Sequence, residues 1–140
     1  VSVGMAVAAA EEAELHILHS VEFPLERPMR LAQAPTDEIK KYREDVRAAA
    51  ELSLQDQLKS QPLETLKNAP QLHVTEAVPE MAIFDAIDEY KIDLVVMGTV
   101  ARAGFSRFLI GNTAERILPA LPCSVIAVKP DEFVCPVQPE

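Results

Sequence analysis

Hydrophobic positions recur along this chain with two different periods. Residues 36–59 and 79–90 carry apolar side chains at three- and four-residue steps, the spacing of one face of an amphipathic helix. A shorter helix is expected at 112–118. Apolar runs of strand length lie between the helical segments, at 14–20, 72–77, 93–97 and 124–128. Strands that alternate with helices predict an α/β domain with a parallel sheet.

The remaining segments are less regular. Residues 1–10 are small and apolar and predict the end of a helix that packs on a sheet. Several prolines interrupt residues 22–36, so we expect a long loop there, with Thr36 as the N-cap of the helix that follows. Three more prolines lie near the carboxyl terminus. We therefore expect one domain over residues 1–130 and a proline-rich tail over residues 131–140.

Composition narrows the class of protein. The chain has 140 residues, of which 49% are hydrophobic and 25% charged, an ordinary balance for one globular domain. No apolar stretch approaches the roughly 18 residues of a membrane span. A net charge of −9 repels phosphate backbones, so we expect neither a membrane nor a nucleic acid as partner. The two cysteines are too few for a disulfide framework, which favours a reducing cytoplasm.

Three glycines cluster after the strand at 93–97. Gly98 ends that strand, Gly104 lies in the following loop, and Gly111 precedes the next helix. Glycine lets a backbone approach a ligand closely, and the amino end of a helix attracts phosphate. In parallel sheets, ligands bind beyond the carboxyl ends of the strands. The arrangement therefore suits an anion, although a tight turn that needs glycine would give the same pattern.

The segment VVMGTVARAGFSRFLIGNTAERILPALPCSVIAVKP resembles the C-terminal half of universal stress proteins. ATP-binding members of that family carry Gly, two residues, Gly, nine residues, Gly and Ser or Thr. This chain has Gly98, two residues, Ala101, nine residues, Gly111 and then Asn112. The stretches GTVARAG and GNTAERIL and the tail KPDEFVCPV are most similar to the second domain of the tandem-domain, E-type branch. The resemblance spans essentially the whole chain and implies the Rossmann-like, adenine-nucleotide alpha-hydrolase-like fold.

The resemblance also implies a ligand, ATP or AMP, with no metal beyond the magnesium that accompanies a nucleotide. The backbone of Val21 matches the family's contact with adenine, although ordinary core packing would also explain this residue. Arg102 could reach a phosphate, or it could pair with a surface carboxylate. The other positions that match the family's phosphate contacts are Gly98, Ala101, Gly104, Gly111, Asn112 and Thr113.

Two departures from the family motif weaken the expectation of nucleotide binding. Ala101 adds a methyl group where the backbone wraps phosphates, and a positive φ there would cost about 1–3 kcal/mol. Asn112 replaces a hydroxyl that would contact phosphate. Asn112 is still a good N-cap, with Glu115 at the capping-box position, so residues 112–115 could cap a helix and bind nothing.

The first strand of the family is a third departure. Family members begin with a central strand that ends in an acidic residue near the ribose and adenine, and nothing before Val1 supplies it. In the family this strand lies between those expected here at 14–20 and 93–97. Each buried backbone group left unpaired would cost roughly 1–3 kcal/mol. We expect a fragment of a longer chain, with two alternatives: a partner supplies the strand, or the flanking strands pair directly.

Candidate catalytic and metal-binding residues are few. His16 and His19 have an odd separation on one strand and face opposite sides, and His73 stands alone, so we expect no metal site. The sequence contains no Ser–His–Asp, HExxH, CxxC or Walker pattern. We expect no enzyme beyond weak ATP hydrolysis. An enzyme of a related nucleotide-binding fold is an alternative, but it would need a Ser/Gly-rich loop after the first strand.

These observations lead to one functional expectation and one main competitor. The resemblance implies a cytoplasmic stress-response module that acts through a dimer or a tandem domain, with nucleotide binding weakened or lost. The contact would run along the last strand, Ser124–Val128. The competitor is a regulatory switch that binds ATP or AMP through residues 98–113.

Overall fold

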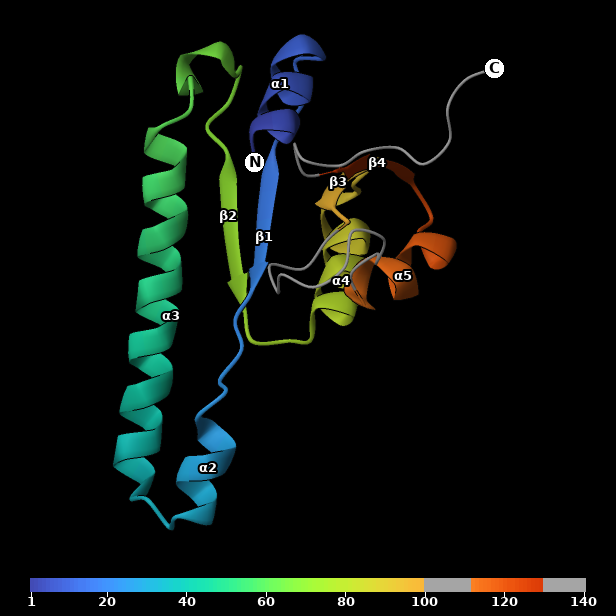
Figure 1. Ribbon diagram of the computed structural model, residues 1–140. Coiled ribbons are helices and arrows are strands. Elements are labelled where there is room, and N and C mark those ends of the chain that lie inside the picture. Colours follow the sequence, from blue (N-terminus) through green and yellow to red (C-terminus); the bar gives the residue numbers. More distant parts are fainter. Residues whose placement is uncertain (100–111, 130–140) are drawn as a thin grey trace. The chain divides into compact units, whose positions relative to one another are not determined.

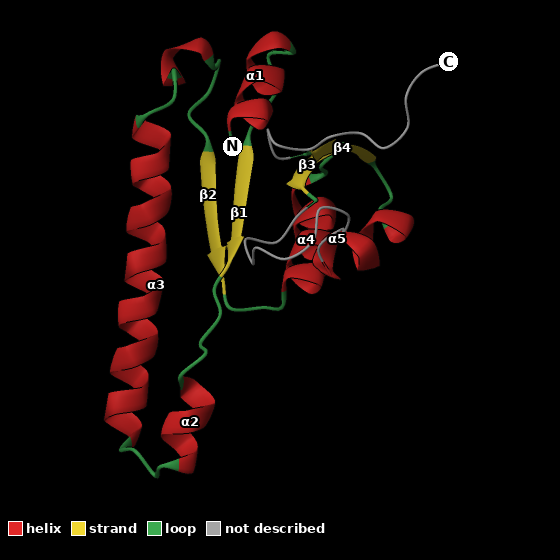
Figure 2. Cartoon of the chain, in the orientation of Figure 1, coloured by secondary structure: helices red, strands yellow, loops and turns green. Residues whose placement is uncertain are grey.

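A computed structural model describes residues 1–99 and 112–129 of the chain (Figures 1 and 2). Its elements are α1 (Ser2–Ala10), β1 (His16–Ser20), α2 (Glu26–Leu31), α3 (Thr36–Lys59), η1 (Leu63–Thr65), β2 (Gln71–Thr75), α4 (Pro79–Tyr90), β3 (Leu94–Gly98), α5 (Asn112–Ile117), η2 (Leu118–Ala120) and β4 (Ser124–Val128). The predicted α/β class with parallel strands is confirmed. The expected tail at 131–140 lies outside the described residues.

The chain divides into two compact units, residues 1–82 and residues 83–140, with the boundary inside α4. In the first unit, β1 and β2 pair in parallel, from His16 opposite Gln71 to Ser20 opposite Thr75. The N–H of Gln71 donates to the carbonyl of Leu15 at 2.8 Å. Since alternate residues of a parallel strand bond on the same side, the backbone groups of His16, Leu18 and Ser20 point away from β2.

The second unit contains the other strand pair. β3 and β4 are parallel, from Leu94 opposite Ser124 to Gly98 opposite Val128. The N–H of Ser124 donates to the carbonyl of Asp93 at 3.1 Å, and the pairing continues past Gly98. By the same alternation, the N–H and C=O groups of Val125 and Ala127 point away from β3. The bounds of β4 are those predicted from the sequence.

The two strand pairs bear on the expected central strand. Within residues 1–99 and 112–129, β1 pairs with β2 alone, and β3 pairs with β4 alone. The two pairs belong to different units. All three alternatives, a longer chain, a partner that supplies the strand, and direct pairing of the flanking strands, stay predictions.

Apolar side chains from several elements form the core of each unit. In the first unit the buried side chains include Met5 and Ala8 of α1, Val21 after β1, and Ile39, Leu54 and Leu58 of α3. In the second they include Ile87 of α4 and Ala114 and Ile117 of α5. Burying a side chain of leucine size contributes about 1.5–3 kcal/mol, so α3 is held mainly by its three buried positions. Figure 1 shows α3 alongside β2.

The segment predicted as a continuous loop, residues 22–36, contains the helix α2. Pro28 is the third residue of α2. The first four N–H groups of a helix have no partner within it, so a proline is tolerated there. The predicted N-cap was also wrong: Pro35 occupies that position and Thr36 is the first helical residue. The N–H groups of Glu38 and Ile39 both donate to the carbonyl of Pro35, which starts α3 without a side-chain cap.

Candidate functional site

Val21, the predicted adenine contact, follows the last residue of β1. Its side chain is 5% exposed, so core packing does account for the side chain. Its N–H donates to the carbonyl of Thr75 at 2.8 Å and extends the strand ladder by one bond. That donor is therefore already used. A base at this position would meet the Val21 carbonyl, an acceptor, and would need an N–H of its own to bond to it.

Hydroxyl groups tie together the two chain segments that leave the carboxyl ends of β1 and β2. The Ser20 hydroxyl donates to the carbonyl of Ala77 at 2.6 Å. The Ala77 N–H donates to the Thr75 hydroxyl at 3.1 Å. Ala77, which follows β2, is thus held through its N–H and its C=O by the last residue of each strand. Sequence analysis missed this pair, and the signal was a hydroxyl residue at the end of the strand predicted at 14–20 and another two residues before the end of the strand predicted at 72–77.

Gly98, the first glycine of the motif, ends β3 and is exposed. A Cβ added there would meet no atom of the described residues within 4 Å. Among the described glycines none has a positive φ, so Gly98 needs no left-handed backbone. Neither packing nor backbone conformation within this part of the chain requires glycine here. The space beside Gly98 is compatible with close approach by a ligand or by another chain segment.

Thr99 anchors the start of the loop. It is 2% exposed, and its N–H donates to the carbonyl of Val128 at 3.1 Å. Its hydroxyl lies 3.4 Å from the same carbonyl, a long contact. The point at which the chain leaves β3 is therefore fixed by the end of β4. A buried threonine directly after the strand was not singled out from the sequence.

The far side of the motif is the helix α5. Ala114 and Ile117 bury its inner face, and Thr113 is half-buried. α5 has six residues, fewer than two turns, so few peptide dipoles add up at its amino end. Such a helix attracts an anion only weakly.

The other predicted contacts are only partly covered by the structure. Ala101, Arg102, Gly104 and Gly111 lie outside the described residues, and Asn112 is described as the first residue of α5 without its side chain. Val21 belongs to the first unit, whereas Gly98 and Thr113 belong to the second. The site residues therefore stay predictions, and the structure supplies local geometry for three of them.

The histidines differ from the expectation. In the β1–β2 register, His73 lies opposite Leu18, and the Nδ1 atom of His16 is 3.0 Å from the Nε2 atom of His73. The ring planes are inclined by only 7° and the centroids are 5.2 Å apart, so the rings meet edge to edge through their nitrogens. The expectation that His73 stands alone is wrong. Within the described residues, no group of three potential ligands could hold a metal ion.

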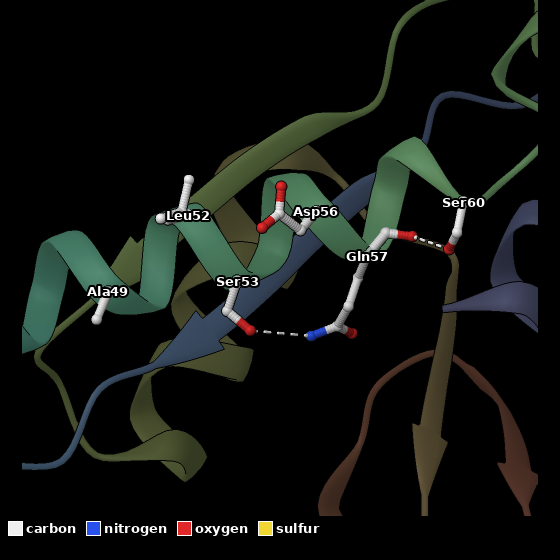
Figure 3. A pocket seen from close by; sticks show the side chains of 6 residues that line it. All are labelled: Ala49, Leu52, Ser53, Asp56, Gln57 and Ser60. Carbon is white, nitrogen blue, oxygen red and sulfur yellow. Dashed lines mark hydrogen bonds between the residues drawn. The ribbon is translucent and has the colours of Figure 1, made fainter.

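A surface hollow runs along α3 (Figure 3). Its lining residues are Ala49, Leu52, Ser53, Asp56, Gln57 and Ser60. The Gln57 amide donates to the Ser53 hydroxyl at 3.4 Å, and the Ser60 hydroxyl donates to the Gln57 carbonyl at 2.8 Å. Five of these residues belong to α3 and Ser60 is its C-cap, so no polar groups converge on the hollow from opposite sides. It lacks the enclosure typical of a small-molecule site.

Comparison with known proteins decides the family. Residues 1–129 match the Universal stress protein family. The chain belongs to this family. The sequence-based recognition is confirmed, and the parallel strand pairs fit the family's Rossmann-like fold.

Relatives among universal stress proteins point to one branch. The chain is 38% identical over 66 residues to Universal stress protein E of Photorhabdus laumondii. The aligned segment covers 47% of this chain and 21% of that protein. It is 41% identical over 66 residues to Universal stress protein E of Salmonella typhi, with the same two shares, 47% and 21%. The matches therefore span about a fifth of the length of these relatives. The predicted likeness to the E-type branch is supported, and the assignment to its second domain stays a prediction.

A solved universal stress protein supports the fold. Universal stress protein UspA from Lactobacillus plantarum matches with a TM-score of 0.63 over 88% of this chain and 82% of that chain. The sequence identity is 21%, so this likeness shows the fold alone. Within the described residues, no helix is both long and apolar enough to cross a bilayer.

Proposed function

We propose that this universal stress protein chain is a stress-response module that works through contacts with a second domain of its own kind. That domain is either a second copy of the chain or a tandem neighbour. The family match over residues 1–129 supports the stress-response role. The observation that carries the contact is the outer edge of β4. We further propose a cytoplasmic setting, no nucleic-acid or membrane partner, and nucleotide binding that is weakened or lost.

The outer edge of β4 presents backbone groups that β3 does not use. The two end bonds of the ladder, at Ser124 and Thr99, fix which residues face β3. The N–H and C=O groups of Val125 and Ala127 therefore point outward. An edge of this kind is a template for one more strand. Val125 is half-buried and Ala127 exposed, so a second strand would meet little steric obstruction from described side chains.

The strand contact is tested with a proline substitution. Ala127→Pro removes one outward N–H, and proline is tolerated where the N–H of an edge strand faces away from its neighbour. We expect the mass in multi-angle light scattering to fall from dimer to monomer, with the circular dichroism spectrum retained. Ile126→Pro is the matched control, because its N–H points toward β3 and its loss should disrupt the fold. A parent chain that is already monomeric, or an Ala127→Pro chain that stays dimeric, contradicts a homodimer through β4.

Three features support weakened nucleotide binding. The N–H of Val21 is already used by Thr75, which leaves adenine only an acceptor. The six-residue α5 provides a weak dipole for phosphates. Ala101 and Asn112 replace two of the family's signature residue types. Each feature removes part of the interaction that an ATP-binding member would make.

The second candidate function is an ATP- or AMP-binding switch, which the open space beside Gly98 favours. In this alternative the phosphates would lie on the amides of residues 111–113, with Arg102 assisting, and magnesium would accompany the nucleotide. Isothermal titration with ATP and Mg²⁺ separates the two functions. Heat that saturates at micromolar ATP would support the switch, and no heat at millimolar ATP would rule it out.

Our proposal includes no catalytic role beyond weak ATP hydrolysis. The sequence carries no Ser–His–Asp, HExxH, CxxC or Walker pattern. An enzyme of a related nucleotide-binding fold is the remaining alternative. Product formation from ATP well above the rate of a buffer blank would contradict our proposal and revive that alternative.

A further inference from the structure

The segment that follows β1 is held to α3 by charged and aromatic contacts at the surface. We call residues 23–31, from Phe23 through the end of α2, the strap. It begins two residues after Val21, and α2 runs beside the amino-terminal part of α3 beyond the carboxyl ends of β1 and β2 (Figure 2). No residue of α2 is buried. Leu25 is 55% exposed and Leu31 is 76% exposed.

One arginine of α3 holds the strap. The Arg43 Nη1 atom donates to Oε2 of Glu26 in α2 at 2.9 Å. Its Nη2 atom donates to the carboxylate of Glu76, which follows β2. The guanidinium carbon lies 4.5 Å from the centre of the Phe23 ring, a cation–π contact. Arg43 therefore joins the amino-terminal part of the strap, at Phe23 and Glu26, to α3 and to the residue that follows β2.

The residue beside Arg43 adds two weaker contacts. The Tyr42 hydroxyl accepts a hydrogen bond from the N–H of Leu25 at 3.2 Å. The Tyr42 and Phe23 rings meet edge to face, with centroids 6.3 Å apart. Arg30 also binds Glu26: its Nε and Nη2 atoms donate to Oε1 of Glu26 at 2.9 and 2.7 Å. The second carboxylate oxygen of Glu26 is thus left for Arg43.

α3 has a second attachment that does not involve the strap. Arg47 lies one turn after Arg43 and donates to the carbonyl of Val74 at 3.2 Å, on the outer edge of β2. It also lies 3.8 Å from the Glu76 carboxylate. With Ile39, Leu54 and Leu58 buried, α3 stays bound to the core by contacts that are independent of Glu26.

These contacts divide the first unit into two parts of different stability. α3 has buried apolar residues, whereas the strap is held by charged and aromatic contacts at the surface. Segments with few buried apolar contacts open at lower free energy than the core. We propose that residues 23–31 are a strap clasped by Arg43 that opens as a unit while β1, β2 and α3 stay folded. Opening moves the segment next to Val21 and so changes access to the carboxyl end of β1. This inference does not depend on the proposed function.

Hydrogen exchange of the full chain tests the strap. In Arg43→Met we expect the amides of residues 25–31 to exchange roughly tenfold faster, because the strap loses the charge-assisted hydrogen bond at Glu26 and the cation–π contact at Phe23. The amides of β1 and of residues 50–59 in α3 should exchange as in the parent. Lys40→Met is the matched control: it removes a positive charge from the same helix, where Lys40 pairs only loosely with Glu44 at 3.9 Å.

A second variant tests the same contact in case Arg43→Met misfolds. Glu26→Gln cuts the clasp from the side of the strap and leaves the Arg43–Glu76 contact intact, and it should speed exchange over the same residues. In 1 M salt, where the Debye length is about 3 Å, exchange of the strap should rise in the parent and change little in Arg43→Met. Unchanged protection of residues 25–31 in both variants overturns the inference. Loss of protection across β1 and α3 together with the strap also overturns it, because the strap would then not be a separate unit.

Discussion

Several single residues in this chain make more than one contact, and these contacts determine which of their hydrogen-bonding groups remain available. The Val21 N–H is used by Thr75 and its side chain by the core, so only its carbonyl is open to a base. Glu26 divides its two carboxylate oxygens between Arg30 and Arg43. Residue types alone do not show how these groups are shared, because Arg43 is 17 positions from Glu26 in the sequence. The spacing of Gly98, Ala101 and Gly111, in contrast, is local and was readable from the sequence.

The first prediction concerns the charge of Glu26. A hydrogen bond from Arg30, the largest cause, and the charges of Arg43 and Arg30 lower the pKa of Glu26 from its ordinary 4.5. Its contribution to folding is therefore fully present above pH 4.5 and is lost as pH falls through the lower folded pKa. In a carbon-13 titration of the carboxyl group we expect a midpoint below 4.5 that rises in Arg30→Gln. Lys40→Gln should leave it unmoved, and a parent midpoint at 4.5 or above would contradict the assignment.

At the scale of elements, the agreement with the sequence follows how local the signal is. β4 has the predicted bounds, and α3 ends where predicted but begins one residue earlier, because an apolar pattern runs through each element. α2 was missed because Pro28 was taken as a breaker, although it sits in a first turn where its missing N–H costs nothing. The His16–His73 contact was also missed, since it depends on the register of β1 against β2.

The hydroxyl pair at the ends of β1 and β2 gives a prediction at this scale. Ser20→Ala leaves the Ala77 carbonyl without its 2.6 Å donor and should lower the free energy of unfolding by about 1 kcal/mol. Thr75→Val removes the acceptor of the Ala77 N–H and should cost about 1–2 kcal/mol. Ser53→Ala, on the exposed side of α3, is the control and should stay within about 0.5 kcal/mol. Urea unfolding followed by circular dichroism measures all three. Equal effects of Ser20→Ala and Ser53→Ala would show that the strand-end contact adds nothing.

At the scale of the molecule, we expect the net negative charge of the chain and the altered glycine motif both to lower the affinity for a nucleotide. The chain carries 22 acidic and 13 basic residues. In the first unit Arg30, Arg43 and Arg47 are already paired with glutamates, so they add little positive field for a polyphosphate. Under our proposal, both the net charge of the chain and the altered motif would oppose binding of a nucleotide with several negative charges. The two effects can be separated, because long-range repulsion is screened by salt and a local steric clash is not.

That separation gives the final prediction. The double substitution Ala101→Gly and Asn112→Ser restores the family's residue types, and it should tighten ATP binding roughly tenfold, since the strain of alanine at positive φ is about 1–3 kcal/mol. Val100→Gly is the matched control: it adds a glycine nearby in the sequence but outside the motif, and its affinity for ATP should equal that of the parent. The remaining repulsion should make ATP bind the double variant more tightly at 0.15 M salt than at 0.01 M, where the Debye length grows from about 8 to 30 Å. Isothermal titration at both salt concentrations measures both effects.

If parent and double variant bind ATP equally, the two departures do not explain weakened binding. If salt instead weakens binding, a local cationic contact outweighs the acidity of the chain, and Arg102 becomes the residue to substitute next.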